Sequence, residues 1–181
     1  STAGHLIGLG ETVRSFHLND AELTGFSGQG LAMGSTMNGS ITVDGITASG
    51  SNGVSEIVTL LAPSDGTQVV FATAPSTFNA LALQADNGVL ANADINTDVD
   101  GMYLDGDMEN ASSADAINTV NAADLRTITA KTELTLESST GRLVNAGALT
   151  LKAAMGVVIL DHLTGAATGN ALVIMSDYES A

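Results

Sequence analysis

The chain has 181 residues, 20 acidic and 5 basic side chains, no cysteine and a net charge of −15. This length fits a single domain, and a mean hydropathy of +0.26 indicates a chain that folds, unlike a disordered acidic tail. The composition excludes disulfides and thiolate metal sites, and the negative charge argues against nucleic acid and anionic lipid as partners. No apolar run is long enough for a membrane-spanning helix.

Residues 1–35 are less regular than the rest of the chain. The glycine-rich segment from Gly28 to Gly34 misses the dinucleotide-binding fingerprint by one residue and lacks the strand and helix that would support it. We therefore treat it as a loop. Residues 36–181 carry repeats, and we treat residues 1–181 as a single domain, or as a segment or repeat unit of a longer chain.

Short segments in which apolar and other residues alternate recur about every 21 residues along the repeats. Alternation of this kind is typical of strands with one buried face. A second series lies between the first at a similar spacing, and two interleaved series indicate coils more than a hairpin meander. The first series comprises Ile41/Val43, Leu60, Leu81/Leu83, Met102/Leu104, Leu125 with Ile128, Leu149/Leu151 and Leu172/Ile174, and the second comprises Ile95, Ile117, Leu136 and Ile159.

Turn-forming pairs such as Asp44-Gly45, Asp65-Gly66 and Asp100-Gly101 separate these segments. Such residues tolerate the left-handed backbone conformations that corners need. Helix signals are weak, because no window of 12 residues keeps an apolar stripe between a cap and a glycine stop. Residues 110–125 are the one place where a turn of helix is expected.

We therefore predict an all-β fold, a parallel β-solenoid with coils of about 20 to 24 residues and about eight coils in the chain. The alternative is an antiparallel β-sandwich, which also has short strands separated by turns. An aromatic content of only 3% favours the solenoid, because sandwich cores are richer in aromatic side chains.

Three segments carry a resemblance to a known family: residues 79–88, 133–141 and 147–156, each with a Leu-x-Leu core followed by a short turn and glycine. They resemble the degenerate coils of filamentous-haemagglutinin-like repeat proteins, over about residues 40–178. The resemblance implies a β-helical fibre, adhesin or matrix protein at the cell surface or outside the cell. It implies a structural role and supplies no catalytic residues.

The segment around Asp94 to Asp107 matches a calcium-loop pattern, with oxygen ligands at alternate positions, a turn glycine and a later carboxylate. The pattern predicts a Ca²⁺ cofactor. The segment departs from the usual calcium loop because it has asparagine at the first ligand position and aspartate at the last, and because no helices flank it. The alternative is an acidic face in contact with solvent. The predicted ligands are Asn96, Asp98, Asp100 and Asp107, with Gly101 at the turn.

Two Asn-x-Ser sequences, at Asn38 and Asn110, are acceptors for N-linked glycan if the chain passes a eukaryotic secretory route.

Catalysis is not expected. The three histidines, His5, His17 and His162, do not have zinc-binding spacing. A β-helical polysaccharide lyase would need a basic residue, and the only candidates in the repeats are Arg126, Lys131, Arg142 and Lys152. The net charge of −15 would also repel an acidic polysaccharide.

The sequence thus predicts a non-catalytic structural module of an extracellular filament, sheath or cell-surface adhesin, with copies of itself as end-to-end partners. Uncapped coils leave unpaired backbone groups at both ends, which favours stacking of copies into filaments. The alternative is a calcium-dependent domain that binds carbohydrate on a surface. A viral spike is a third candidate that the sequence does not separate from a cellular fibre.

Overall fold

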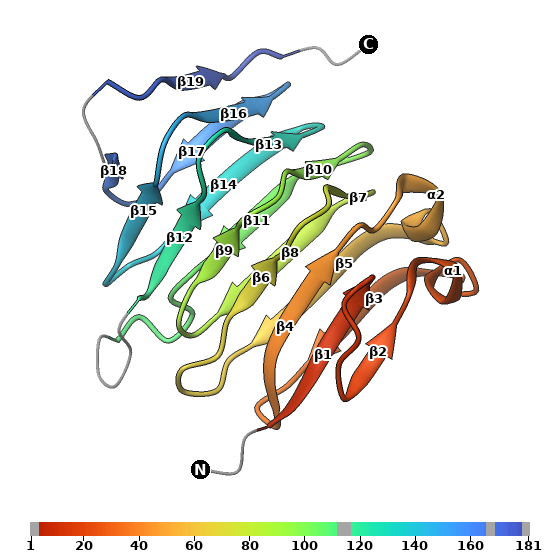
Figure 1. The fold of residues 1–181 in the computed structure, drawn as a ribbon. Helices are drawn as coiled ribbons and strands as arrows, with labels where there is room; N and C mark the ends of the chain where they lie inside the picture. Colours follow the sequence, from red (N-terminus) through yellow and green to blue (C-terminus); the bar gives the residue numbers. More distant parts are fainter. Residues whose placement is uncertain (1–3, 112–116, 166–168, 179–181) are drawn as a thin grey trace.

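The chain is a parallel β-solenoid. The computed structural model describes residues 4–111, 117–165 and 169–178, and in them nineteen strands and two short helices wind into stacked coils (Figure 1). Every strand pairing in these residues is parallel. The predicted β-solenoid is confirmed, and the antiparallel sandwich is excluded.

The strands form three sheets, whose spatial order runs from the C-terminal to the N-terminal end of the stack. Sheet A contains β18 (Leu163–Gly165), β15 (Arg142–Asn145), β12 (Thr119–Ala122), β9 (Val89–Ala91), β6 (Val69–Phe71), β4 (Asn38–Asp44), β1 (His5–Gly10) and β2 (Phe16–Leu18). Sheet B contains β17 (Gly156–Ile159), β14 (Glu133–Glu137), β11 (Met102–Asp105), β8 (Leu81–Ala85), β5 (Val54–Ala62) and β3 (Gly28–Gly34). The prediction of a loop at residues 28–34 is therefore wrong, because this segment pairs with β5 as a strand. Sheet C contains β19 (Leu172–Met175), β16 (Leu149–Ala153), β13 (Arg126–Ala130), β10 (Ile95–Thr97) and β7 (Ser76–Phe78).

Each coil visits sheet A, then sheet C, then sheet B, so that β6, β7 and β8 form one circuit and β9, β10 and β11 form the next (Figure 1). Sheet B receives one strand from each complete coil, and β18 with β19 begins a further one. The described residues therefore contain six complete coils and part of a seventh. This is fewer than the eight we expected, because some coils are longer than the repeat.

Coil length explains a second difference from the sequence analysis. Ile128, Leu151 and Ile174 are register partners 23 residues apart, whereas Ile95 pairs with Ile128, 33 residues away. The long coil contains a loop between β11 and β12. The first apolar series consequently changes sheets, from sheet B at Leu81 to sheet C at Leu149, and does not follow one column of stacked residues.

Two helices that the sequence analysis missed replace sheet C in the first coils. Helix α1 (Asp20–Leu23) begins at Asn19, whose side chain forms a capping box with Glu22, and α2 (Ala48–Ser51) begins at Thr47. Figure 1 shows both helices on one side of the N-terminal end, in line with sheet C. At four residues each they are too short to leave a periodic apolar stripe. One turn of helix was expected between residues 110 and 125; residues 112–116 of that segment lie outside the described residues, and the described remainder contains no helix.

The core lies inside the coils. Strand residues alternate between buried and partly exposed, as in β8, where Leu81, Leu83 and Ala85 point inward. In sheet B, Leu60, Leu83, Leu104 and Leu136 are register partners in successive coils, and all four are buried. Among the described residues, no helix has the length and apolar character needed to cross a membrane.

Truncating this column tests the packing. Leu104 is fully buried, so Leu104→Ala is expected to lower the free energy of unfolding by about 2–5 kcal/mol, from lost transfer energy and a residual cavity. Urea denaturation followed by far-UV circular dichroism measures the change. The control is Val99→Ala in the turn before β11, where the side chain is 56% exposed and the change should stay within about 0.5 kcal/mol. Equal effects in the two variants would contradict the assigned core.

Candidate functional site: the acidic corners and the two end faces

The structure does not bring the predicted calcium ligands together. Asn96 lies in β10, Asp98 and Asp100 lie in the turn that follows, and Asp107 lies beyond the far end of β11. Because β11 is extended, Asp100 and Asp107 flank its two ends. Asp100 Oδ1 instead accepts hydrogen bonds from Gly101 N at 2.8 Å and from Thr132 Oγ1 at 2.7 Å, in the next coil.

Four aspartates at the connection from sheet A towards sheet C form what we call the aspartate ladder. Each carboxylate accepts a hydrogen bond from a backbone N–H at the same corner of the next coil. The bonds run to Asp20 Oδ1 from Thr47 N (2.8 Å), to Asp44 Oδ1 from Thr73 N (3.1 Å) and Ala74 N (2.7 Å), to Asp94 Oδ1 from Thr127 N (2.9 Å), and to Asp124 Oδ1 from Ala148 N (2.7 Å).

The connection from sheet B to sheet A uses aspartates in the same way. In this case the carboxylates of Asp86, Asp107 and Asp161 each accept a backbone N–H from an adjacent coil. The donors are Gly66 N at 2.7 Å, Thr140 N at 2.6 Å and Ser138 N at 2.7 Å, respectively. At corners, where strands end and the regular ladder stops, these side chains satisfy backbone donors that would otherwise need water.

The acidic composition therefore has a structural basis that the sequence analysis missed. Hydrogen bonds from backbone N–H groups stabilise the carboxylates at these corners, so these carboxylates do not each need a bound cation. The signal was present as aspartates at the turns, but sequence alone does not show which backbone groups of another coil they meet. Asp98 and Asp100 are exposed, in agreement with the alternative of an acidic face towards solvent.

Removing one ladder carboxylate tests this role. Asp44 is buried and holds two backbone N–H groups, so Asp44→Ala is expected to lower the free energy of unfolding by about 1–3 kcal/mol. Urea titration of both Asp44→Ala and the control Asp98→Ala measures the difference, because Asp98 is an exposed turn acid. A loss in the control as large as in Asp44→Ala would contradict the proposed role.

A tyrosine and two carboxylates meet on the outer face of sheet B. Tyr103 Oη donates to Glu137 Oε2 at 2.5 Å and lies 3.5 Å from Asp105 Oδ2. Burial raises the pKa of Asp105 above its ordinary 3.8, and the charges of Glu137 and Asp107 raise it further, while a hydrogen bond from Asp107 N opposes the shift. Burial and the bond to Glu137 likewise raise the pKa of Tyr103.

The raised pKa of Asp105 makes the stability of the folded chain depend on pH. Asp105 binds its proton more tightly in the folded chain than in the unfolded chain, so its contribution is favourable at low pH and is lost as pH rises from about 3.8 through the raised pKa. Asp105→Asn removes this loss. We expect the variant to gain stability relative to the wild type as pH rises through that window, by denaturant titration at several pH values.

The control for this experiment is Glu133→Gln, on the exposed end of β14. A stability difference between wild type and Asp105→Asn that does not change with pH would contradict the raised pKa.

Three acids also gather at the corner between sheets B and A. Carboxylate oxygens of Asp65, Asp86 and Glu109 all lie within 4.8 Å of one another, and Asp86 is buried while the other two are exposed. Asp86 already accepts the N–H of Gly66. The group adds negative charge to this edge of the solenoid, and Glu109 itself lies in the loop between β11 and β12.

The two glycan acceptors differ in accessibility. Asn38 is 7% exposed, and its Nδ2 donates to Gly39 O at 2.7 Å and to Leu61 O at 3.2 Å. A glycan would replace one of the two hydrogens on this nitrogen and so break at least one of these bonds. Asn110 is exposed in the loop after β11. Glycosylation at these positions stays a prediction, with Asn110 the accessible acceptor.

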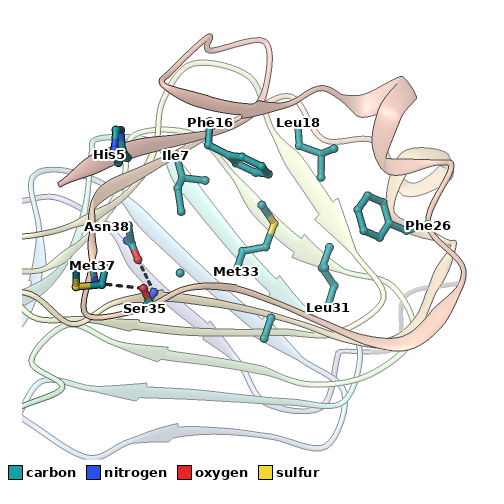
Figure 2. Close-up of a pocket in the computed structure, with 12 residues that line it drawn as sticks. His5, Ile7, Phe16, Leu18, Phe26, Leu31, Met33, Ser35, Met37 and Asn38 are labelled. Atoms are coloured by element: carbon teal, nitrogen blue, oxygen red, sulfur yellow. Dashed lines mark hydrogen bonds between the residues drawn. The ribbon is translucent and has the colours of Figure 1, made fainter.

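The N-terminal end of the solenoid opens as a wedge. Sheet A has two strands there, β1 and β2, beyond β4, whereas sheet B has only β3 beyond β5. The space between them has a volume of about 520 Å³, and Figure 2 shows Phe16 and Ile7 from one side facing Met33 from the other. Phe16 and Phe26 are partly exposed. We call this surface the N-terminal end face.

The C-terminal end is also apolar. All four residues of β19 are apolar and 41–46% exposed. Leu172 and Ile174 are register partners of buried Leu149 and Leu151, so they occupy inward positions with no further described strand above them. These residues and the adjoining edges of β17 and β18 form what we call the C-terminal end face.

The three histidines lie at different places in the structure, and His162 directly follows the corner residue Asp161. His17 Nε2 lies 2.6 Å from Gly10 O, His5 lines the N-terminal wedge and His162 lies exposed between β17 and β18. The one group of three or more possible metal-binding side chains among the described residues contains no histidine. The expectation that the chain is not an enzyme stays a prediction.

Comparison with known proteins finds no matching family model, curated protein or solved structure. The likeness to filamentous-haemagglutinin-like repeats therefore stays a resemblance.

Proposed function

We propose that this chain is a non-catalytic structural module that assembles end to end with copies of itself, in a filament, sheath or adhesin outside the cell or at its surface. The observation that carries the proposal is the pair of apolar end faces. A solenoid coil is stabilised by its neighbours, so an end coil gains stability when another coil covers it.

The two end faces have the composition of contact surfaces. Natural edge strands are commonly protected by charged residues, proline or a covering element. Strand β19 has the sequence Leu-Val-Ile-Met, which contains no charged residue and no proline. Its inward apolar positions are exposed. At the other end, Phe16, Phe26 and Met33 line a wedge of about 520 Å³. Covering both faces would remove apolar surface from water.

The direction of the strands favours a head-to-tail arrangement. All described pairings are parallel, so a copy placed along the solenoid axis presents its first strands in the direction that the last strands of the preceding copy require. Helix α1 occupies the sheet C position at the N-terminal end, so backbone pairing would run between β18 and β2 in sheet A and between β17 and β3 in sheet B. Such a contact uses different surfaces on the two copies and produces filaments.

The charge distribution supports assembly through the ends over lateral association. The net charge of −15 makes copies repel one another where charged sides would meet. The C-terminal end face has an uncharged strand at its edge.

Two single variants test this arrangement. Phe16→Glu blocks the N-terminal end face and Ile174→Glu blocks the C-terminal end face, because both side chains are about half exposed there and an added carboxylate would be buried in the contact. Wild type is expected to form filaments of uniform width as concentration rises, measured by negative-stain microscopy and sedimentation velocity. Each variant alone should remain monomeric, and a mixture of the two should form dimers and nothing longer.

The matched control is Val99→Glu, an exposed turn position away from both ends, which should assemble like wild type. Dimers of either blocked variant alone would show a symmetric contact and contradict the head-to-tail arrangement. Monomers of wild type at all concentrations would contradict the proposal and favour the alternative, a calcium-dependent domain that binds carbohydrate.

A further inference from the structure

The loop between β11 and β12 closes on itself at its base. The chain leaves β11 at Gly106 and re-enters sheet A at Thr119, and the two are in such close contact that a Cβ on Gly106 would overlap the backbone of Thr119. Ser138 Oγ donates to Asn118 O in the same region. The base therefore joins residues from both ends of the loop to the next coil.

Three side-chain oxygens at this base are buried and have no hydrogen-bond partner: Asp107 Oδ1, Asn118 Oδ1 and Thr119 Oγ1. The residues are 0%, 5% and 9% exposed, respectively. Buried polar oxygens without partners are rare in folded proteins, because each has given up its water. Three such oxygens at the base of one loop indicate a bound ligand that several oxygen atoms contact.

Hydrogen bonds hold the two longer side chains in place. Thr140 N donates to Asp107 Oδ2 at 2.6 Å, and Asn118 Nδ2 donates to Thr140 Oγ1 and to Ala111 O, both at 3.1 Å. Because Asn118 Nδ2 faces two acceptors, the amide orientation is set and Oδ1 is left free. The shared partner, Thr140, brings the Asp107 and Asn118 side chains to one point of the next coil.

The chemistry of these atoms matches a hard cation. A carboxylate, an amide carbonyl and a hydroxyl are oxygen donors of the kinds that bind Ca²⁺. Asp107 has no basic partner among the described residues. Asp105, whose Oδ1 accepts the N–H of Asp107, adds further negative charge beside it.

We propose that a Ca²⁺ ion binds at the base of this loop through Asp107 Oδ1, Asn118 Oδ1 and Thr119 Oγ1, with water completing the coordination. The ion joins the two ends of the loop and thereby ties the longest coil to its neighbour. Of the ligands that the sequence pattern predicted, only Asp107 belongs to this site. The site is independent of the end faces, and therefore of the proposed assembly.

Isothermal titration of the calcium-free full chain with CaCl₂, at a concentration where it is monomeric, tests the site. We expect one saturable site per chain and a higher melting temperature in Ca²⁺ than in EDTA, since the folded chain alone binds the ion. Asp107→Asn and Thr119→Val should each weaken binding at least tenfold. Thr119→Val, which keeps side-chain size, covers the case in which Asp107→Asn fails to fold.

The matched controls remove acids elsewhere: Asp98→Asn and Asp100→Asn from the sequence pattern, and Asp65→Asn from the neighbouring acidic group. All three should retain wild-type affinity. Absence of binding in the wild type would overturn the proposal, as would binding that survives Thr119→Val and a folded Asp107→Asn, or that is lost in any of the controls. Loss of binding with unchanged filaments would leave the proposed function standing, which keeps the two proposals distinguishable.

Discussion

Hydrogen bonding between stacked coils is the interaction on which the rest of this structure depends. Each coil is too thin to enclose a core alone, so its strands and its apolar interior are stabilised by the coils on either side. The parallel ladders supply these bonds along the strands. At the corners, where the ladders stop, aspartates such as Asp44 and Asp124 bind backbone N–H groups of the next coil and continue the connection.

This use of aspartate explains how a chain with a net charge of −15 forms a compact stack. Carboxylates that accept backbone N–H groups are stabilised as anions. The ladder aspartates lie one or two coils apart, since the coil of β6 between Asp44 and Asp94 supplies none. The charge remains concentrated in places. Around the loop between β11 and β12, Asp105, Asp107 and the group of Asp65, Asp86 and Glu109 share one edge of the solenoid. The proposed calcium site lies at that edge, where unpartnered oxygens and negative charge coincide.

The two end coils differ from the interior coils because each lacks a neighbouring coil on one side. Interior coils bury apolar residues such as Leu104 completely, whereas Ile174 and Phe16 occupy end positions and remain about half exposed. A sheet closed into a barrel removes its edges, but a solenoid keeps two. In the proposed assembly, stacking of copies would cover both ends with the same kinds of interaction that join one coil to the next. Charged sides and apolar ends would then direct growth along one axis.

The fold class could be predicted from the sequence, because alternation within short segments and a repeat of about 21 residues are local properties that stacked strands satisfy. The pairs Asp44-Gly45, Asp65-Gly66 and Asp100-Gly101 also lie at connections between elements, as predicted. The sheet that each segment joins could not be predicted, since the long coil before Ile128 shifts the repeat. The four-residue helices were equally hidden, because they leave no periodic signal.

The acidic sites could likewise be predicted only in part from the sequence. The sequence showed that acids and turns coincide, and it included Asp107 among the calcium ligands, but it joined Asp107 to Asn96, Asp98 and Asp100, which β11 separates from it. Only the folded chain reveals that Asp107 and Asn118 share Thr140 as a partner, and that Asp44 binds the N–H of Ala74. The physical reason is that these partners lie one coil apart, and the number of residues in a coil is set by how the whole stack packs.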